Sequence, residues 1–112
     1  MPTVFVTQLP SRREHGVWIP ILDITSAKSF GDLHILSPSG LNYATLQQIM
    51  PVLCEKLSAF KPEDFLLPLG DPLLMSLASA FLGSQLKTFN ILKWDRKEMK
   101  YYSYTVSIAA KQ

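Results

Sequence analysis

The stretch FLLPLGDP, residues 65–72, decides the fold because it holds a strand, a turn and the start of a helix. Residues 65–69 form a short apolar run, which is typical of a buried strand. Asp71 is of a type preferred at helix N-caps, and Pro72 suits the first helical position, where its missing N–H needs no partner. We therefore predict a strand over 65–69 that leads directly into a helix beginning at Pro72.

The helix predicted from Pro72 to about Leu82 is apolar on nearly all sides. Gly83 follows it and would supply a C-terminal cap, because glycine adopts the left-handed conformation without steric penalty. A helix of this composition needs cover over most of its surface. We expect it to be buried inside the domain or covered by a partner.

A second strand-to-helix unit lies upstream. Residues 32–36 are short and apolar between two turn-forming stretches, as expected for an inner strand. Thr45 and Gln48 match the capping-box pattern. The apolar residues that recur at helical spacing after Thr45 are Leu46, Ile49, Met50, Leu53, Leu57 and Phe60. Pro51 falls inside this pattern and removes a backbone hydrogen bond, so we expect a kinked helix or one that begins nearer Met50.

The first 24 residues contain weaker signals. Residues 3–8 include the β-prone run Val-Phe-Val and predict the first strand, which ends at Leu9-Pro10. Residues 11–16, SRREHG, are polar and charged, and we expect a loop there. Residues 17–24 resume an apolar pattern that contains Pro20, so an edge strand or an irregular extended segment is expected.

The end of the chain predicts an antiparallel hairpin. Its strands cover residues 88–94 and 101–108 and flank the charged stretch DRKEMK, residues 95–100. With Trp94 opposite Tyr101, the face expected to be core carries Phe89, Ile91, Lys93, Tyr102, Tyr104 and Val106. The other face is mixed and carries Asn90, Leu92, Trp94, Tyr101, Ser103 and Thr105.

Length and element order together predict an α/β fold. The chain has 112 residues, 47% of them apolar and 18% charged, so we expect one folded domain over residues 1–112. Strands that alternate with helices imply parallel neighbours in the sheet. The expected architecture is a mixed, mostly parallel sheet of about five strands, with two main helices and a C-terminal antiparallel hairpin.

Charge and cysteine content narrow the classes of partner and compartment. The formal net charge is +2, which produces no large field toward nucleic acid or anionic lipid. Cys54 is the only cysteine, which excludes an internal disulfide and fits a reducing compartment. The start of the sequence lacks the pattern of a signal peptide, and prolines and a glycine interrupt the apolar region 65–82. We expect a cytoplasmic protein that does not bind membranes.

The first candidate site comprises the two strand-to-helix junctions, because open parallel sheets bind ligands at the carboxyl ends of their strands. Its residues are Ser37, Ser39, Gly40, Gly70 and Asp71. A small ligand or nucleotide could bind there through free amides at the helix starts. Pro72 removes one such amide, Asp71 repels anions, and neither junction matches a phosphate-binding glycine motif. Ordinary helix capping explains these residues better.

The second candidate site is a basic and aromatic set that could form a nucleic-acid or partner surface. It consists of Arg12, Arg13, Lys93, Trp94, Arg96 and Tyr101, with Lys97, Lys100 and Tyr102 nearby. Single-strand binders stack bases on aromatic rings while cations follow the phosphates. Glu14, Asp95 and Glu98 dilute the charge, so nucleic-acid binding is not the favoured interpretation.

The remaining polar residues suggest no catalytic centre. The acids Asp23, Asp32, Asp64, Asp71 and Asp95 occur at spacings that do not bring two or three carboxylates to one metal ion. His15, His34 and Cys54 lack the companions of a Cys-His nucleophile. We expect no catalytic residues, no metal and no cofactor, and an enzyme is the less favoured class.

Three segments resemble small uncharacterised proteins encoded by tailed bacteriophages. They are residues 6–13 (VTQLPSRR), residues 66–72 (LLPLGDP), and residues 91–96 (ILKWDR) followed by Tyr101 or Tyr102. The resemblance covers most of the chain but carries no catalytic residues. It implies a phage-encoded accessory protein made in the host cytoplasm, and it implies origin more than function.

The leading hypothesis is a non-enzymatic binding or regulatory protein that acts through a protein surface or as a homo-oligomer. It rests on the apolar helix after Pro72 and on the pair Trp94 and Tyr101, because both need cover. The alternatives are small-ligand or nucleotide binding at the two junctions and single-strand nucleic-acid binding by the C-terminal hairpin.

Overall fold

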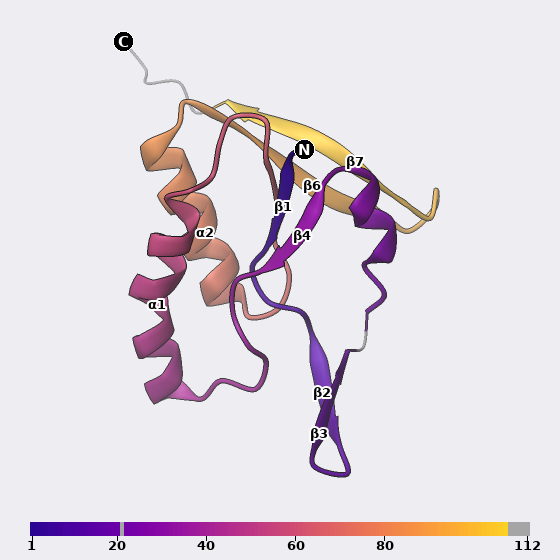
Figure 1. Ribbon diagram of the computed structural model, residues 1–112, viewed down its shortest axis with the longest axis vertical. Coiled ribbons are helices and arrows are strands. Elements are labelled where there is room, and N and C mark those ends of the chain that lie inside the picture. The colour runs from indigo at the N-terminus through magenta and orange to yellow at the C-terminus, as the bar shows by residue number, and fades with distance from the viewer. Residues whose placement is uncertain (21, 108–112) are drawn as a thin grey trace.

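The computed structural model describes residues 1–20 and 22–107, and it places two helices on one face of a five-stranded sheet (Figure 1). The elements in chain order are β1 (Thr3–Val6), β2 (Ser11–Glu14), β3 (Val17–Pro20), the 3₁₀ helix η1 (Thr25–Ser29), β4 (Asp32–Ile35), α1 (Tyr43–Leu57), β5 (Phe65–Leu67), α2 (Pro72–Gln85), β6 (Thr88–Asp95) and β7 (Lys100–Ser107).

The five-stranded sheet has the order β4-β1-β5-β6-β7. β1 pairs in parallel with β4 and β5, β5 pairs in parallel with β6, and β7 is antiparallel to β6. The predicted α/β class, the mixed and mostly parallel sheet, and the C-terminal hairpin are therefore confirmed. The hairpin register is confirmed as well, with Trp94 opposite Tyr101. Ile108, the last residue of the predicted strand, lies outside the described residues.

The start of α2 agrees with the prediction, and its end does not. Asp71 is the N-cap, its Oδ1 accepts a hydrogen bond of 2.9 Å from the Leu73 N–H, and Pro72 follows as the first helical residue. The helix then runs through Gly83 to Gln85, so the predicted cap at Gly83 is wrong. Leu86 packs against the core and its N–H still donates to the Leu82 carbonyl, which favours one further helical turn.

α1 begins earlier than predicted. Its N-cap is Asn42, whose Oδ1 accepts a 3.0 Å bond from the Thr45 N–H while the Thr45 hydroxyl accepts a 2.8 Å bond from the Asn42 N–H. The capping box predicted at Thr45 and Gln48 is therefore wrong, and so is a start near Met50. The helix continues across Pro51, which lies on its exposed side, where water can bind the carbonyl that loses its donor.

A projecting hairpin replaces the loop predicted over residues 11–16. β2 and β3 pair antiparallel across a turn at His15 and Gly16, which have φ values of 51° and 78°. A two-residue turn with positive φ matches the twist of a hairpin and favours glycine. Figure 1 shows this hairpin extending away from the five-stranded sheet. The extended segment predicted from residue 17 is thus a strand only to Pro20, and Ile21 lies outside the described residues.

β4 is an edge strand and not the predicted inner strand. The chain returns from η1 to the outer side of β1, while the next strand, β5, takes the other side. His34 and Ile35 are consequently exposed. A short apolar run has the same composition at an edge and in the middle of a sheet, so the sequence pattern could not separate the two.

Both faces of the sheet carry a core. The cluster under the helices comprises Phe5, Leu36, Leu53, Leu57, Phe60, Leu66, Ala78, Leu82 and Phe89. The cluster on the other face comprises Val4, Val6, Ile24, Ala27, Leu67, Leu92 and Tyr101, and η1 supplies Ile24 from its N-cap and Ala27 from its interior. The hairpin face predicted to be core is core only in part, because Tyr104 is 50% exposed.

The described part of the chain, residues 1–20 and 22–107, contains no helix with the length and apolar character needed to cross a lipid bilayer.

Gly70 offers a test of how tightly this fold is built. It has a φ of +89°, and a Cβ added to it would collide with the Gln8 side chain. We expect Gly70→Ala to lower the free energy of unfolding by more than about 1 kcal/mol, measured by urea denaturation. Gly16→Ala is the matched control, since Gly16 also has a positive φ but open space around it. Equal losses in the two variants would contradict the proposed collision.

Candidate functional site

The two strand-to-helix junctions meet at the carboxyl end of β1, where the strand order reverses. After β1 the chain adds β4 on one side, and it then adds β5 on the other side. Such a switch point is where open α/β sheets bind their ligands. The loops that follow β4 and β5 contain all five residues predicted for a ligand site. Those residues are Ser37, Ser39, Gly40, Gly70 and Asp71.

Gln8 fills the space between the two junctions. Its side chain is 7% exposed, its Nε2 donates a 2.8 Å hydrogen bond to the Pro38 carbonyl, and its Oε1 accepts a 2.8 Å bond from the Asp71 N–H. The amide at the start of α2 is therefore already bonded within the chain. Gly70 lacks the Cβ that would collide with Gln8. Ligand binding at this point stays a prediction, and it requires Gln8 to give up its bonds.

Thr7 ties β1 to the loop after β5 in a similar way. Its buried hydroxyl accepts a 2.7 Å hydrogen bond from the Leu69 N–H and donates to the Leu69 carbonyl. Sequence reasoning missed Thr7 and Gln8, because it assigned them only to the first strand. The available signal was a pair of polar residues directly after the buried run Val-Phe-Val, at the end of a strand.

The junction after β4 also bonds to its own chain. Ser37 is 2% exposed and its hydroxyl donates a 3.2 Å hydrogen bond to the Pro38 carbonyl. The Ser39 hydroxyl donates a 2.6 Å bond to the Leu9 carbonyl. Gly40 lies under the indole ring of Trp18, so that a Cβ at this position would collide with the ring. These groups hold the loop against the residues that follow β1.

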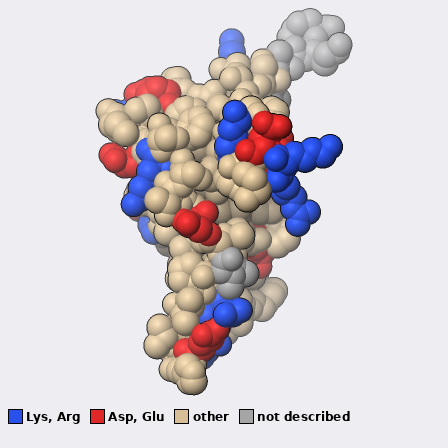
Figure 2. Space-filling model, turned by 90° about the vertical axis from the view of Figure 1, so that its right-hand side faces the viewer, with Lys and Arg blue, Asp and Glu red and all other residues tan. Residues whose placement is uncertain are grey.

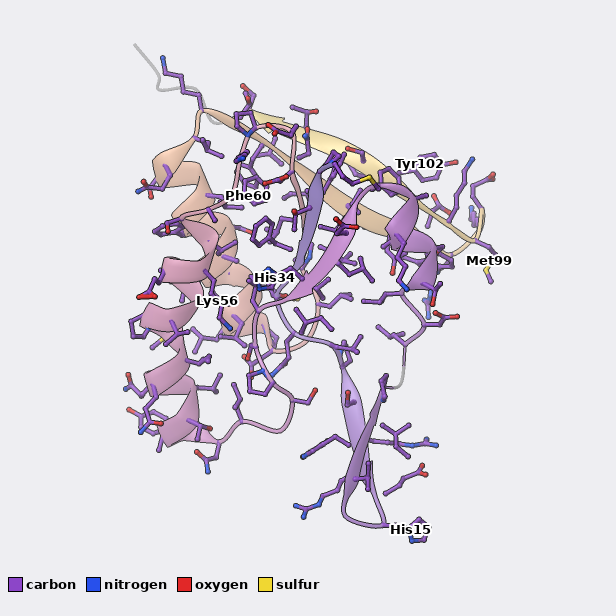
Figure 3. All side chains as sticks on the ribbon, in the orientation of Figure 1. His15, His34, Lys56, Phe60, Met99 and Tyr102 are labelled. Carbon is purple, nitrogen blue, oxygen red and sulfur yellow. The ribbon has the colours of Figure 1, made fainter. Side chains whose placement is uncertain are left out.

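The basic and aromatic set is divided between distant parts of the molecule. Arg12 and Arg13 lie on β2 of the projecting hairpin, whose tip is marked by His15 in Figure 3. Lys93 and Trp94 lie on β6, Tyr101 lies on β7, and Arg96 lies in the loop between these strands. This loop ends at Met99, which Figure 3 places far from His15.

Trp94 and Tyr101 pack under the protein's own 3₁₀ helix. Their ring centroids are 4.9 Å apart in an edge-to-face arrangement, and Tyr101 is only 8% exposed. Tyr101 belongs to the core cluster that contains Ile24 and Ala27, and Trp94, which is half-buried, packs against it. Burial raises the pKa of the Tyr101 phenol above its ordinary value, and the carboxylate of Asp23 adds to the rise. The Tyr101 ring is therefore too buried for a base to stack on it, whereas Trp94 keeps part of its surface exposed.

The acids and histidines serve local structure. Asp64 is buried and accepts hydrogen bonds from the N–H groups of Thr3 and Lys61, at 2.9 and 2.8 Å. Asp95 accepts from the N–H groups of Lys97 and Glu98. Across residues 1–20 and 22–107, no three His, Cys, Asp or Glu side chains lie close enough together to hold a metal ion.

A hollow of about 520 Å³ lies between β4 and the end of α1, and sequence reasoning did not predict it. Figure 3 shows its two labelled residues, His34 and Lys56, on facing elements. His34 stacks on Phe5 at 5.5 Å, and the Lys56 Nζ donates a 3.2 Å bond to the Leu36 carbonyl. Lys61, Glu55 and Glu63 also line the hollow, so its rim carries both signs of charge. This mixture selects no class of ligand.

The bridging role of Gln8 can be tested with an apolar side chain of similar length. We expect Gln8→Met to lower the free energy of unfolding by about 2 kcal/mol, because the Asp71 N–H and the Pro38 carbonyl lose their partner in a partly buried place. Urea denaturation measures the loss. Gln85→Met, on the exposed end of α2, should change stability by less than about 0.5 kcal/mol. A neutral Gln8→Met would refute the bridge.

Because the phenol of Tyr101 is buried, we expect the protein to lose stability at alkaline pH. Its pKa is about 10 in the unfolded chain and higher in the folded protein, so the folded state resists ionisation. The stability that this group contributes is therefore complete below pH 10 and is lost as the pH rises through the folded pKa. Urea denaturation between pH 8 and 11 should show a steeper decline for the unchanged protein than for Tyr101→Phe. Parallel declines would contradict this assignment.

Comparison with known proteins identifies the family. The family model described as Phage Pam3 gp32-like protein matches residues 2–108, which is nearly the whole chain. Searches of curated proteins and of solved structures found no match. The resemblance to phage proteins seen in three short segments is thereby confirmed, and the chain belongs to the phage-encoded Phage Pam3 gp32-like protein family.

Proposed function

We propose that this phage protein is a non-enzymatic accessory protein that acts by binding protein, with the β2–β3 hairpin as its contact element and a second copy of the chain as its partner. The observation that carries the proposal is the exposure of β3. All four of its residues are exposed although three are large and apolar, with Val17 at 61%, Trp18 at 45% and Ile19 at 39%. Contiguous exposed apolar residues mark interaction sites more often than free surface.

The hairpin has little support from its own chain. A two-stranded hairpin alone is marginally stable in water. Trp18 rests on Gly40, and two serine hydroxyls bond to the Leu9 carbonyl at its base. Among the described residues, β2 and β3 pair only with each other, so each keeps one free edge. A partner that adds strands would stabilise the hairpin and cover its apolar residues together.

The charges on the two strands favour pairing through β3. β3 reads Val-Trp-Ile-Pro and carries no charge, whereas β2 carries Arg12, Arg13 and Glu14. A second copy related by a two-fold axis would place β3 against β3 and form a four-stranded sheet without opposing like charges. Pairing through β2 would instead bring the arginines of both copies together, which is unfavourable.

The two features first expected to need a partner are mostly covered within the chain, although Leu73 on α2 stays exposed. α2 buries Leu74, Ala78 and Leu82 against the sheet and α1. The Trp94 and Tyr101 pair lies under η1. The case for self-association therefore moves from these residues to β3, which lies in a segment that was expected to be an edge strand or an irregular extended segment.

We expect the unchanged protein to form dimers. The double variant Val17→Thr, Ile19→Thr should raise the dissociation constant of the dimer at least about tenfold. Sedimentation equilibrium over a range of concentrations measures both constants. Threonine keeps the β-branched shape that suits a strand, so the hairpin itself should persist.

Tyr43→Thr provides the matched control for this experiment. Tyr43 is 78% exposed and lies on α1, outside the hairpin. Its replacement should leave the dissociation constant unchanged. The proposal would be overturned if the unchanged protein stayed monomeric at millimolar concentration. It would also be overturned if the double variant and Tyr43→Thr raised the dissociation constant equally.

A further inference from the structure

The outer face of the β6–β7 hairpin is an open surface near the hairpin tip. Side chains alternate along a strand, so the residues next to Trp94 and Tyr101 point away from η1. Ile91 and Val106 on this face pack against the helix-side core, but the part nearer the hairpin tip is open. The open part carries Lys93, Lys100, Tyr102 and Tyr104.

Aromatic rings and cations lie side by side on this face. Tyr104 is 50% exposed, and the Lys100 Nζ lies 5.0 Å from the centre of the Tyr102 ring. Tyr102 follows Tyr101 directly on β7, so its ring points to the face opposite the one that packs under η1. Tyr102 and Tyr104 are two residues apart on one strand, so both rings point to the same side. They form a short platform with a cation at its edge.

The adjoining loop adds positive charge. Arg96 and Lys97 are exposed and lie close in sequence to Lys93 and Lys100. These four basic residues outnumber the two acids of the same segment, Asp95 and Glu98. The Asp95 carboxylate is bonded to the loop's own N–H groups at 2.9 Å. Figure 2 looks onto this end of the molecule and shows Lys and Arg side chains standing out beside the acids. The excess of basic groups lies beside the aromatic platform.

We propose that this face binds single-stranded nucleic acid, with bases stacked on Tyr104 and Tyr102 and phosphates held by Lys93, Arg96, Lys97 and Lys100. An open sheet surface with exposed rings and neighbouring cations is the combination that binds unpaired strands with little sequence preference. A duplex keeps its bases stacked inside and would use only the cations. The proposal does not depend on self-association, because the β2–β3 hairpin extends from another part of the molecule (Figure 1).

This surface differs from the one that the sequence suggested. Trp94 and Tyr101 belong to the same hairpin but lie under η1, where no base can reach both rings. Arg12 and Arg13 are on the distant hairpin. The predicted residues that remain are Lys93, Arg96, Lys97, Lys100 and Tyr102. Tyr104 on the same face as Tyr102 takes the place of Trp94 and Tyr101.

The test uses a fluorescein-labelled oligothymidylate and fluorescence anisotropy at several salt concentrations. We expect saturable binding whose log affinity falls with log salt at a slope of about −2 to −3, as four phosphate contacts would give. Tyr104→Thr should weaken binding at least about fivefold, because one stacked base is lost. Tyr104→Phe keeps the ring and should bind as the unchanged protein does.

A lysine outside the proposed surface provides the matched control for Lys93. Lys93→Gln should reduce the salt slope by about 0.7, whereas Lys87→Gln, at an exposed position before β6, should leave it unchanged. Circular dichroism and thermal unfolding verify that each variant is folded. Absence of saturable binding at about 50 mM salt, equal affinity for duplex DNA, or full binding by a folded Tyr104→Thr would overturn the proposal.

Discussion

The arrangement of the sheet and its loops depends on two hydrogen bonds made by the side-chain amide of Gln8. One side chain binds the loop after β4 through its nitrogen and the start of α2 through its oxygen. Thr7, one residue earlier, holds Leu69 by both of its backbone groups. The carboxyl end of β1 therefore fixes the ends of both neighbouring strands. These bonds are partly buried, so the loss of one partner would leave a polar group unpaired at a cost in stability.

The same bonds occupy the position at which this topology usually binds a ligand. Related architectures leave helix N-termini free at the switch point so that backbone amides can bind a ligand. Here the Asp71 N–H is bonded to Gln8, and the Asp71 carboxylate caps the helix. Both surfaces that we propose for binding lie elsewhere, on the β2–β3 and β6–β7 hairpins.

Local signals predicted much of the fold. The pair Asp71 and Pro72 marked the start of α2 because its helix-start chemistry lies within two neighbouring residues. The register of β6 and β7 followed from the loop that joins them. Features that depend on distant contacts were missed. The sequence pattern of β4 is the same at an edge as in the middle of a sheet, and Gly83 stays helical because Leu86 packs against the core. For the candidate site, topology predicted the two junctions, whereas the amide that joins them is visible only in three dimensions.

The β2–β3 hairpin occupies the connection between β1 and β4, where many α/β folds place a helix. β3 contributes no buried residue, and the hairpin joins the body through short segments on either side. The core would keep its composition if this hairpin changed in length or sequence. A change in the hairpin would therefore alter the exposed apolar surface without removing a buried side chain from either face of the sheet. In that respect the hairpin is an appendage of the sheet and not part of its frame.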